Sequence, residues 1–182
     1  MALNDQATLA VATGHFYSAP VGTDIPVSLT APDATWEEIG HTSLSDIIQF
    51  SSEGGEATIL GTLQNKQLRT SYSSRTESFN IVLQQFDEAG LKLFYGSNAV
   101  MDDATGMLQV PTNPIPTTCA FLIVFEDGRN VFSMYVPKCE IYRGDDFSIA
   151  SAEELASLPL AVKPMQFGSN GYTYAISPLG DI

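Results

Sequence analysis

The segment between Phe50 and Ser71 constrains this chain most, because its composition fits neither a solvated linker nor a core strand. Residues 51–70 read SSEGGEATILGTLQNKQLRT and combine three glycines with four large aliphatic residues. Loops of this length inside a compact domain are uncommon and are usually functional or disordered. Disordered segments are poor in aliphatic residues. The sequence therefore favours a long loop that becomes ordered against another molecule.

Length and composition favour one folded domain over residues 1–182. The chain is 44% hydrophobic and can bury a core of ordinary size. Residues 1–13 are interpreted as an N-terminal arm, and they contain no Lys or Arg, unlike the start of a signal peptide. No apolar run approaches the roughly 18 residues that a membrane helix requires. We expect no membrane insertion and a cytosol-like compartment.

The formal net charge of −13 argues against specific binding of DNA or RNA, which depends on Lys and Arg neutralising phosphates. Charged residues make up 16% of the chain, against about 25% in typical soluble domains. Such a surface is suited to being covered by other proteins. The alternative is that Ser and Thr simply occupy exposed strand faces, as in many β-proteins.

Alternating and apolar runs predict a mainly β protein. The clearest is Ser74 to Gln84, in which apolar residues on one face alternate with Ser78, Asn80 and Gln84 on the other. Short strands are also predicted at Gly14–Pro20, Thr35–Thr42, Ile47–Phe50, Leu160–Phe167 and Tyr172–Ile176, whereas the proline-rich stretch Asn98–Pro116 argues against a long regular element.

The strongest predicted hairpin joins Thr118–Glu126 to Asn130–Arg143 through a turn at Asp127-Gly128. The first of these strands is apolar on both faces, which indicates a strand covered on both sides. Pro137 indicates that the returning strand is bulged or lies at an edge.

This turn sets an expectation for the two cysteines. It places Val136 opposite Cys119, so Cys139 falls three residues away and on the other face of the sheet. A disulfide between Cys119 and Cys139 is therefore not expected. Both are predicted to be buried or half-buried free thiols.

Two segments change to helical spacing. Phe86–Gly96 has Asp87 as a candidate N-cap and ends at a glycine. The sequence Ser-Ala-Glu-Glu from Ser151 matches a capping box, which predicts a second, two-turn helix. The predicted fold is mainly β, a β-sandwich or partly open barrel with one principal short α-helix.

The chain carries few residues that could support catalysis. His15 and His41 are its only imidazoles, and no Cys or His stands at zinc-ligand spacing. No nucleophile elbow, P-loop or dinucleotide fingerprint occurs. The acidic pairs lie on adjacent residues, and Asp102–Gly106 lacks the ligand pattern of an EF-hand. We predict no enzyme activity, no metal and no cofactor.

The order of these elements resembles the tail tube, or major tail, proteins of long-tailed, non-contractile bacteriophages. The resemblance is carried by GHFYSAPVGTDIPVSLTAPDATWEEIG from residue 14, by TWEEIGHTSLSDIIQF from residue 35, and by the loop, strand and helix that follow as far as Gly96. It covers most of the chain and is weaker after Gly96. It rests on order and spacing and not on a catalytic fingerprint.

The resemblance implies a β-sandwich protomer that assembles into hexameric rings. The rings stack into a hollow virion tube around a tape-measure protein, are assembled in the host cytoplasm, and later conduct the genome without binding it specifically. The long loop, residues 51–70, would contact a neighbouring subunit or ring, and Ser78, Asn80 and Gln84 would face the lumen. The residues assigned to the inter-subunit loop are Glu53, Gly54, Gly55, Glu56, Ile59, Leu60, Leu63 and Leu68.

Three other readings stay open. A carbohydrate-binding or adhesion β-sandwich would use tryptophan and tyrosine side chains such as Trp36, Tyr135 and Tyr174 as a sugar platform, although aromatic strand residues more often pack within a sheet. A single-ring tail-terminator or joining subunit would share the fold and the ring symmetry. An acidic hydrolase would need a converging pair of carboxylates, for which the sequence gives little support.

Overall fold

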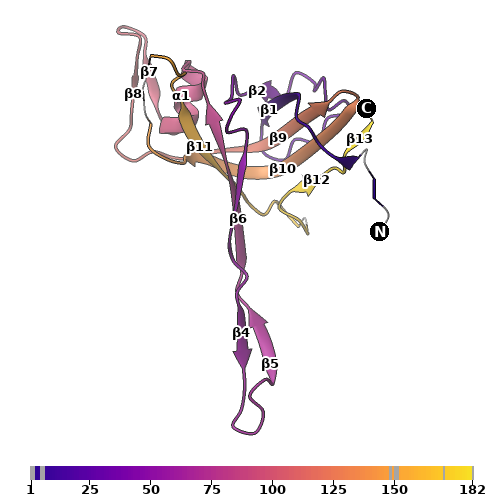
Figure 1. The fold of residues 1–182 in the computed structure, drawn as a ribbon. Helices are drawn as coiled ribbons and strands as arrows, with labels where there is room; N and C mark the ends of the chain where they lie inside the picture. The colour runs from indigo at the N-terminus through magenta and orange to yellow at the C-terminus, as the bar shows by residue number, and fades with distance from the viewer. Residues whose placement is uncertain (1–2, 5–6, 148, 150–151, 170, 182) are drawn as a thin grey trace.

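The computed structural model describes residues 3–4, 7–147, 149, 152–169 and 171–181, and it shows a mainly β protein with one α-helix (Figure 1). The largest sheet is antiparallel and open, with strand order β2-β1-β9-β10-β11-β6-β3. Two short strands, β12 and β13, also pair with β10. The sheet is not closed into a barrel. The strands of this sheet are β1 (Thr13–Ala19), β2 (Glu37–Glu38), β3 (Gln49–Gly54), β6 (Arg75–Leu83), β9 (Thr117–Asp127), β10 (Asn130–Arg143), β11 (Leu158–Pro164), β12 (Ala175–Ile176) and β13 (Gly180–Asp181).

Strand β9 lies at the centre of the fold and is buried on both faces, as its sequence predicts. Phe121, Ile123 and Phe125 point into the larger core, to which the helix contributes Phe94. The alternate residues of β9 point into a smaller core on the other face of the sheet, where Trp36 packs edge-on against Tyr135 with ring centroids 6.2 Å apart. Burial of both faces is what orders the sheet.

The register of β9 and β10 corrects the expectation for the two cysteines. Asp127 pairs with Asn130, so the turn residues are Gly128 and Arg129. Gly128 has φ 63°, a conformation that glycine adopts without strain. The turn therefore lies one residue later than the sequence suggests, and this moves every pairing along the hairpin.

A β-bulge between Val136 and Cys139 adds a further shift, as Pro137 indicates from the sequence. Cys139 is consequently the direct partner of Cys119, and the two side chains share one face. The prediction that they lie on opposite faces is wrong. Both cysteines are free and buried, as expected.

The helix predicted at Phe86–Gly96 is confirmed as α1 (Glu88–Tyr95). The Asp87 carboxylate accepts a hydrogen bond from the Gly90 amide at 2.8 Å. Gly96 ends the helix at φ 110°, where its amide donates to the Lys92 carbonyl. Phe94 lies on the buried side of the helix and anchors it to the sheet.

The second predicted helix does not form in the part of its segment that the structure describes. Residues 152–154 are bends, and Leu158 already begins β11. Ser151 lies outside the described residues. Leu158 is fully buried and pairs with Leu83 of β6. Pairing with the sheet therefore overrides the local capping signal.

The remaining predicted strands are present but shifted or shorter. Only Glu37 and Glu38 of the predicted strand Thr35–Thr42 are assigned to a strand, and Ile47–Phe50 is replaced by the later and longer β3. The stretch Asn98–Pro116 contains only a small hairpin, β7 (Val100–Asp102) with β8 (Met107–Gln109). Strands β11 and β12 both pair with β10.

Candidate assembly surface

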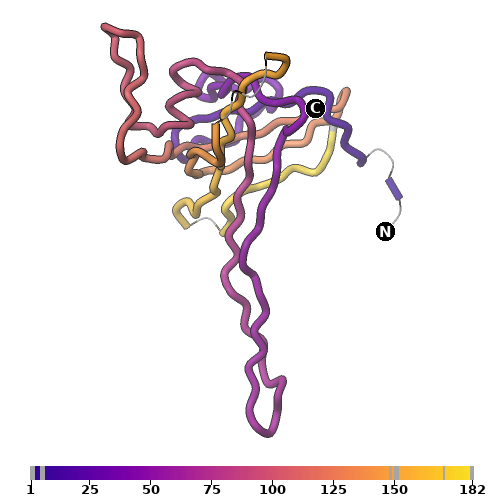
Figure 2. Tube along the Cα trace, turned by 60° about the vertical axis from the view of Figure 1, so that its left-hand side comes forward, coloured from indigo at the N-terminus to yellow at the C-terminus, as the bar shows by residue number. Residues whose placement is uncertain are grey.

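A long hairpin, called the arm below, projects from the body of the protein (Figure 1 and Figure 2). Its root is the β3–β6 ladder, in which Gln49 pairs with Asn80 and Gly54 with Arg75. Its outer half is the pair β4 (Ala57–Leu60) and β5 (Arg69–Tyr72). The arm therefore spans residues 49–80, and its outer half, residues 57–72, is the arm tip. In both views the tip points away from the body of the protein.

This architecture corrects the expectation of a long loop over residues 51–70, because much of the segment forms strands. The segment pairs with itself as strands because extended backbone needs hydrogen-bond partners. Two of its glycines lie where β3 ends: Gly54 is the last residue of β3 and Gly55 follows it, with φ 84° and 73°. The third, Gly61, follows β4, where a Cβ would lie 2.4 Å from the Lys66 carbonyl oxygen. The glycines thus mark the joint and the end of the hairpin.

The joint and the tip are both held by hydrogen bonds. At the joint, the Ser73 amide donates to the Glu56 carbonyl and the Glu56 amide donates to Ser73 Oγ, each at 3.0 Å. At the tip, the Thr62 amide donates to the Asn65 carbonyl at 2.7 Å. The Asn65 amide in turn donates to Thr62 Oγ1 at 3.1 Å. The arm is a defined element as far as its end.

Large apolar side chains on the arm tip are left uncovered by the protomer. The side chain of Leu63 is 93% exposed and that of Tyr72 is 72% exposed, and Ile59, Leu60 and Leu68 are also exposed. Ile59 and Tyr72 share one face of the β4–β5 ladder, whereas Leu60 and its partner Arg69 share the other. Exposed apolar residues on an unprotected strand pair are typical of a surface that binds another chain.

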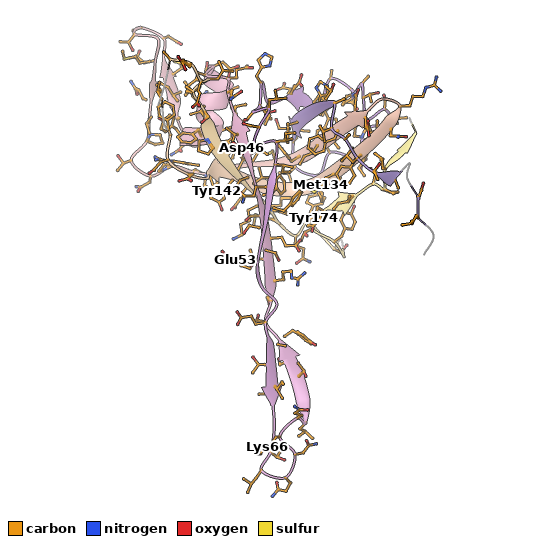
Figure 3. The ribbon with its side chains drawn as sticks, viewed as in Figure 1. Asp46, Glu53, Lys66, Met134, Tyr142 and Tyr174 are labelled. Carbon is orange, nitrogen blue, oxygen red and sulfur yellow. The ribbon has the colours of Figure 1, made fainter. Side chains whose placement is uncertain are left out.

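The assigned acidic residues lie nearer the body than the apolar ones. Glu53 lies in β3 and Glu56 at the joint, and both are exposed (Figure 3). The outermost charges are Lys66 and Arg69. Figure 3 shows Lys66 at the far end of the arm.

Two of the three predicted lumen residues lie together. Ser78 and Asn80 share one face of β6, opposite the buried Phe79, and they pair with Ser51 and Gln49 of β3. The third, Gln84, lies beyond the end of β6 and is half-buried, with its amide donating to the His41 carbonyl at 2.7 Å. Which face lines a lumen stays a prediction.

Two grooves flank the root of the arm. No sequence pattern predicts either of them, because each is built from segments far apart along the chain. The first, of about 580 Å³, is lined by residues 45–49, Asn80, Val82, residues 144–145 and Pro159. The second, of about 350 Å³, is mainly apolar and includes Phe50, Phe79, Phe132, Met134, Tyr174 and Ile176. Figure 3 places Met134 and Tyr174 beside the arm root.

Titratable groups elsewhere have structural roles. The carboxylate of Asp102 accepts from Thr105 Oγ1 at 2.8 Å and from the Ala104 amide at 3.0 Å, and these bonds lower the pKa of Asp102. His15 contacts Glu38 at 2.7 Å on the surface. Within the described residues, no group of three or more His, Cys, Asp or Glu side chains is arranged to hold a metal ion. None of the helices in the same part of the chain is long and apolar enough to cross a membrane.

Comparison with known proteins gives two concordant findings. Residues 1–177 match the family model described as "Phage tail tube protein". The chain is 34% identical over 173 residues to the "Major tail protein Gp23" of Mycobacterium phage L5, covering 88% of this chain and 85% of that protein. The protein of the same name from Mycobacterium phage D29 matches with the same identity and coverage. The similarity extends beyond Gly96, where the sequence resemblance was weaker.

Proposed function

This chain belongs to the phage tail tube protein family and is a structural protein of the virion tail, and we propose that its arm docks onto neighbouring copies to build stacked hexameric rings. The observation that carries this proposal is the arm itself, with large apolar side chains exposed on both faces of its tip. Twelve residues, Gln49 to Leu60, lead from the root of the arm to the end of β4. At a rise of about 3.3 Å per residue they span about 40 Å, which is enough to reach another protomer.

The geometry of such a contact favours a repeating assembly. The tip of one copy meets a different surface on the next copy, so the contact is head-to-tail. Head-to-tail contacts generate rings when the rotation closes and open stacks when it does not. Docking also covers the edges of β4 and β5, which are otherwise free to pair with another strand. The sixfold symmetry itself comes from the resemblance to the family.

The role as a conduit rests on charge. A net charge of −13 per protomer disfavours the counterion-releasing contacts that would trap DNA on a basic wall. We assign Ser78, Asn80 and Gln84 to the lumen face, the tape-measure protein to the lumen before DNA delivery, and assembly to the host cytoplasm.

A single ring, as in a tail terminator, is the second candidate, since it would use the same fold. The sugar-binding alternative is weakened by burial: Trp36 and Tyr135 are 5% and 7% exposed and pack against each other in the smaller core. The rings of Trp36 and Tyr135 are therefore not exposed for stacking against a sugar.

Electron microscopy of two matched proteins tests the proposal. In the shortened-arm variant, an Asn-Gly turn replaces residues 57–72, because Glu56 and Ser73 already pair and can close the new hairpin. We expect tubes from the unmodified protein and separate, folded protomers from the variant. A tip variant with Gln64→Ser controls for mere mutation of the tip. Tubes formed by the shortened-arm variant would overturn the proposal.

A further inference from the structure

The arm tip differs in charge from the rest of the chain. Residues 57–72 contain Lys66 and Arg69 and none of the 21 acidic residues. The tip therefore carries a charge of +2. The rest of the chain has six Lys or Arg against 21 Asp or Glu, a charge of −15. A basic tip on an acidic body is attracted to the body of a second copy.

The two cations of the tip lack an anionic partner among the residues that the structure describes. The ion pairs there join His15 to Glu38, Lys92 to Glu88 and Arg143 to Asp146. Arg69 lies directly opposite Leu60 on one face of the tip, so that face is both cationic and apolar. A matching surface needs carboxylates beside apolar side chains.

The larger groove at the root of the arm has this composition. Asp46 and Asp145 contribute carboxylates, while Ile47, Ile48 and Val82 contribute apolar side chains. Its volume of about 580 Å³ leaves room for side chains from another molecule. This surface is called the acidic groove below.

Both carboxylates of the acidic groove are available to a cation. Asp46 is exposed, and no Lys or Arg in the described part of the chain contacts it. Asp145 is exposed and accepts the backbone amide of Asp146 at 2.7 Å. The neighbouring Arg143 guanidinium forms an ion pair with Asp146, with Nη2 and Oδ1 2.6 Å apart.

The second groove at the arm root is a poorer match. It is mainly apolar, and its one acidic lining residue, Glu77, already accepts a hydrogen bond from Tyr174. Arg75 and Lys163 line the adjoining depression next to it. A cationic tip would meet like charge there, which costs free energy.

We propose that the arm tip of one copy docks in the acidic groove of a second copy, with Lys66 and Arg69 facing Asp46 and Asp145 and with Leu60 and Leu63 against the isoleucines. This inference rests on the proposed role of the arm and names the surface that receives it. Figure 3 shows Asp46 in the body of the protein and Lys66 at the far end of the arm, so the contact lies between copies. Each copy offers a tip and a groove, which lets the contact repeat without limit. Asn80 lines the groove, so this docking would cover it and remove it from the lumen face assigned above, whereas Ser78 lies outside the groove.

A charge-swap experiment tests the assignment. The tip variant carries Lys66→Glu and Arg69→Glu, the groove variant carries Asp46→Lys and Asp145→Lys, and a third protein carries all four changes. We expect each double variant to raise the protein concentration needed for tube formation at least about tenfold, because like charges then meet at the contact. The fourfold variant is expected to recover most of that loss. An unchanged tip or groove variant, or a fourfold variant no better than either, would overturn the inference.

Carbodiimide cross-linking of the unmodified protein gives an answer that needs no variant to fold. The reagent joins a lysine amine to a contacting carboxylate, and we expect a peptide linking Lys66 to Asp46 or Asp145 in tubes and not in dissociated protomers. A Lys66 cross-link exclusively to other carboxylates would contradict the inference. If the shortened-arm variant loses assembly while the charge variants assemble normally, the arm keeps its role and only the groove is wrong. If the shortened-arm variant forms tubes, the proposed role of the arm is wrong, and the inference that rests on it is wrong as well.

Discussion

Cys119 and Cys139 face each other across β9 and β10, with their Sγ atoms 3.8 Å apart in the larger core. Cys139 Sγ also donates to the Cys119 carbonyl at 3.4 Å. The bulge between Val136 and Cys139 creates this contact, since an unbroken register would put another residue opposite Cys119. The pair therefore reports on the packing at the centre of the sheet.

We predict that both thiols are unreactive in the folded protein. The hydrogen bond with Cys119, together with burial, raises the pKa of the Cys139 thiol well above its usual range. The same hydrogen bond lowers the pKa of the Cys119 thiol, so the protection of Cys119 comes from its burial in the larger core. Only the thiolate reacts readily with a disulfide reagent. An aromatic disulfide reagent at pH 8 should therefore release little colour from the native protein and two equivalents after unfolding in guanidinium. Rapid reaction of the native protein would contradict the described burial.

Apolar residues of the arm tip are predicted to matter for assembly and not for folding. Leu60→Asp or Leu63→Asp should prevent tube formation, because a charge is then buried without a partner in the contact. Since both side chains are exposed in the protomer, its free energy of unfolding should change by less than about 0.5 kcal/mol. Phe79→Ala is the opposite control. This change leaves a cavity at a buried site and should lower the free energy of unfolding by about 3–5 kcal/mol.

Gly54 is predicted to set the direction of the outer arm. Its φ is 84°, and a Cβ there would lie 2.2 Å from the Ser74 carbonyl oxygen, so Gly54→Ala must displace one strand of the joint. We expect poor assembly with an unchanged melting temperature of the body, measured by microscopy and by circular dichroism. Gly171→Ala is the matched control, because no atom lies within 4 Å of its Cβ position. If the Gly54→Ala variant formed normal tubes, Gly54 would not be needed to set the direction of the outer arm.

Tyr174 is predicted to make the protomer sensitive to alkali at the arm root. Its hydroxyl donates to Glu77, and this hydrogen bond, followed by burial, raises the pKa of Tyr174 above 10.0. A raised pKa in the folded state stabilises the protein below pH 10, and this contribution is lost as the pH rises through the folded value. Tyr174→Phe should therefore lose less stability than the unmodified protein between pH 9 and pH 11 in urea unfolding. Equal losses would contradict the role of this bond.

Local patterns in the sequence were sufficient where a single element decides the outcome. The alternation of Phe79, Ile81 and Leu83 identifies the buried face of β6, and Asp87 and Gly96 identify both ends of the helix. Each of these signals depends on residues within one element. The corresponding predictions are confirmed.

Predictions failed where distant segments decide the structure. The contact between Cys119 and Cys139 depends on the turn position and on the bulge, and two small register errors reversed the predicted faces. The arm lacks alternation because both of its faces are exposed, so its strands resembled a loop. The acidic groove brings Asp46 and Asp145 to one surface only once β3, β6, β11 and β10 are paired. No spacing rule along the chain could reveal it.

The lumen assignment yields a last prediction, for Ser78. This residue lies on the polar face of β6, outside the acidic groove. In a Ser78→Cys variant, a maleimide should react with the new cysteine and not with the two native cysteines, because these are buried. If Ser78 lines the lumen, a small maleimide should label assembled tubes, whereas a maleimide coupled to a large protein should label only dissociated protomers. Mass spectrometry of the modified peptide measures both reactions. Equal labelling of tubes by the two reagents would place Ser78 on the outer surface and exclude its face of β6 from the lumen.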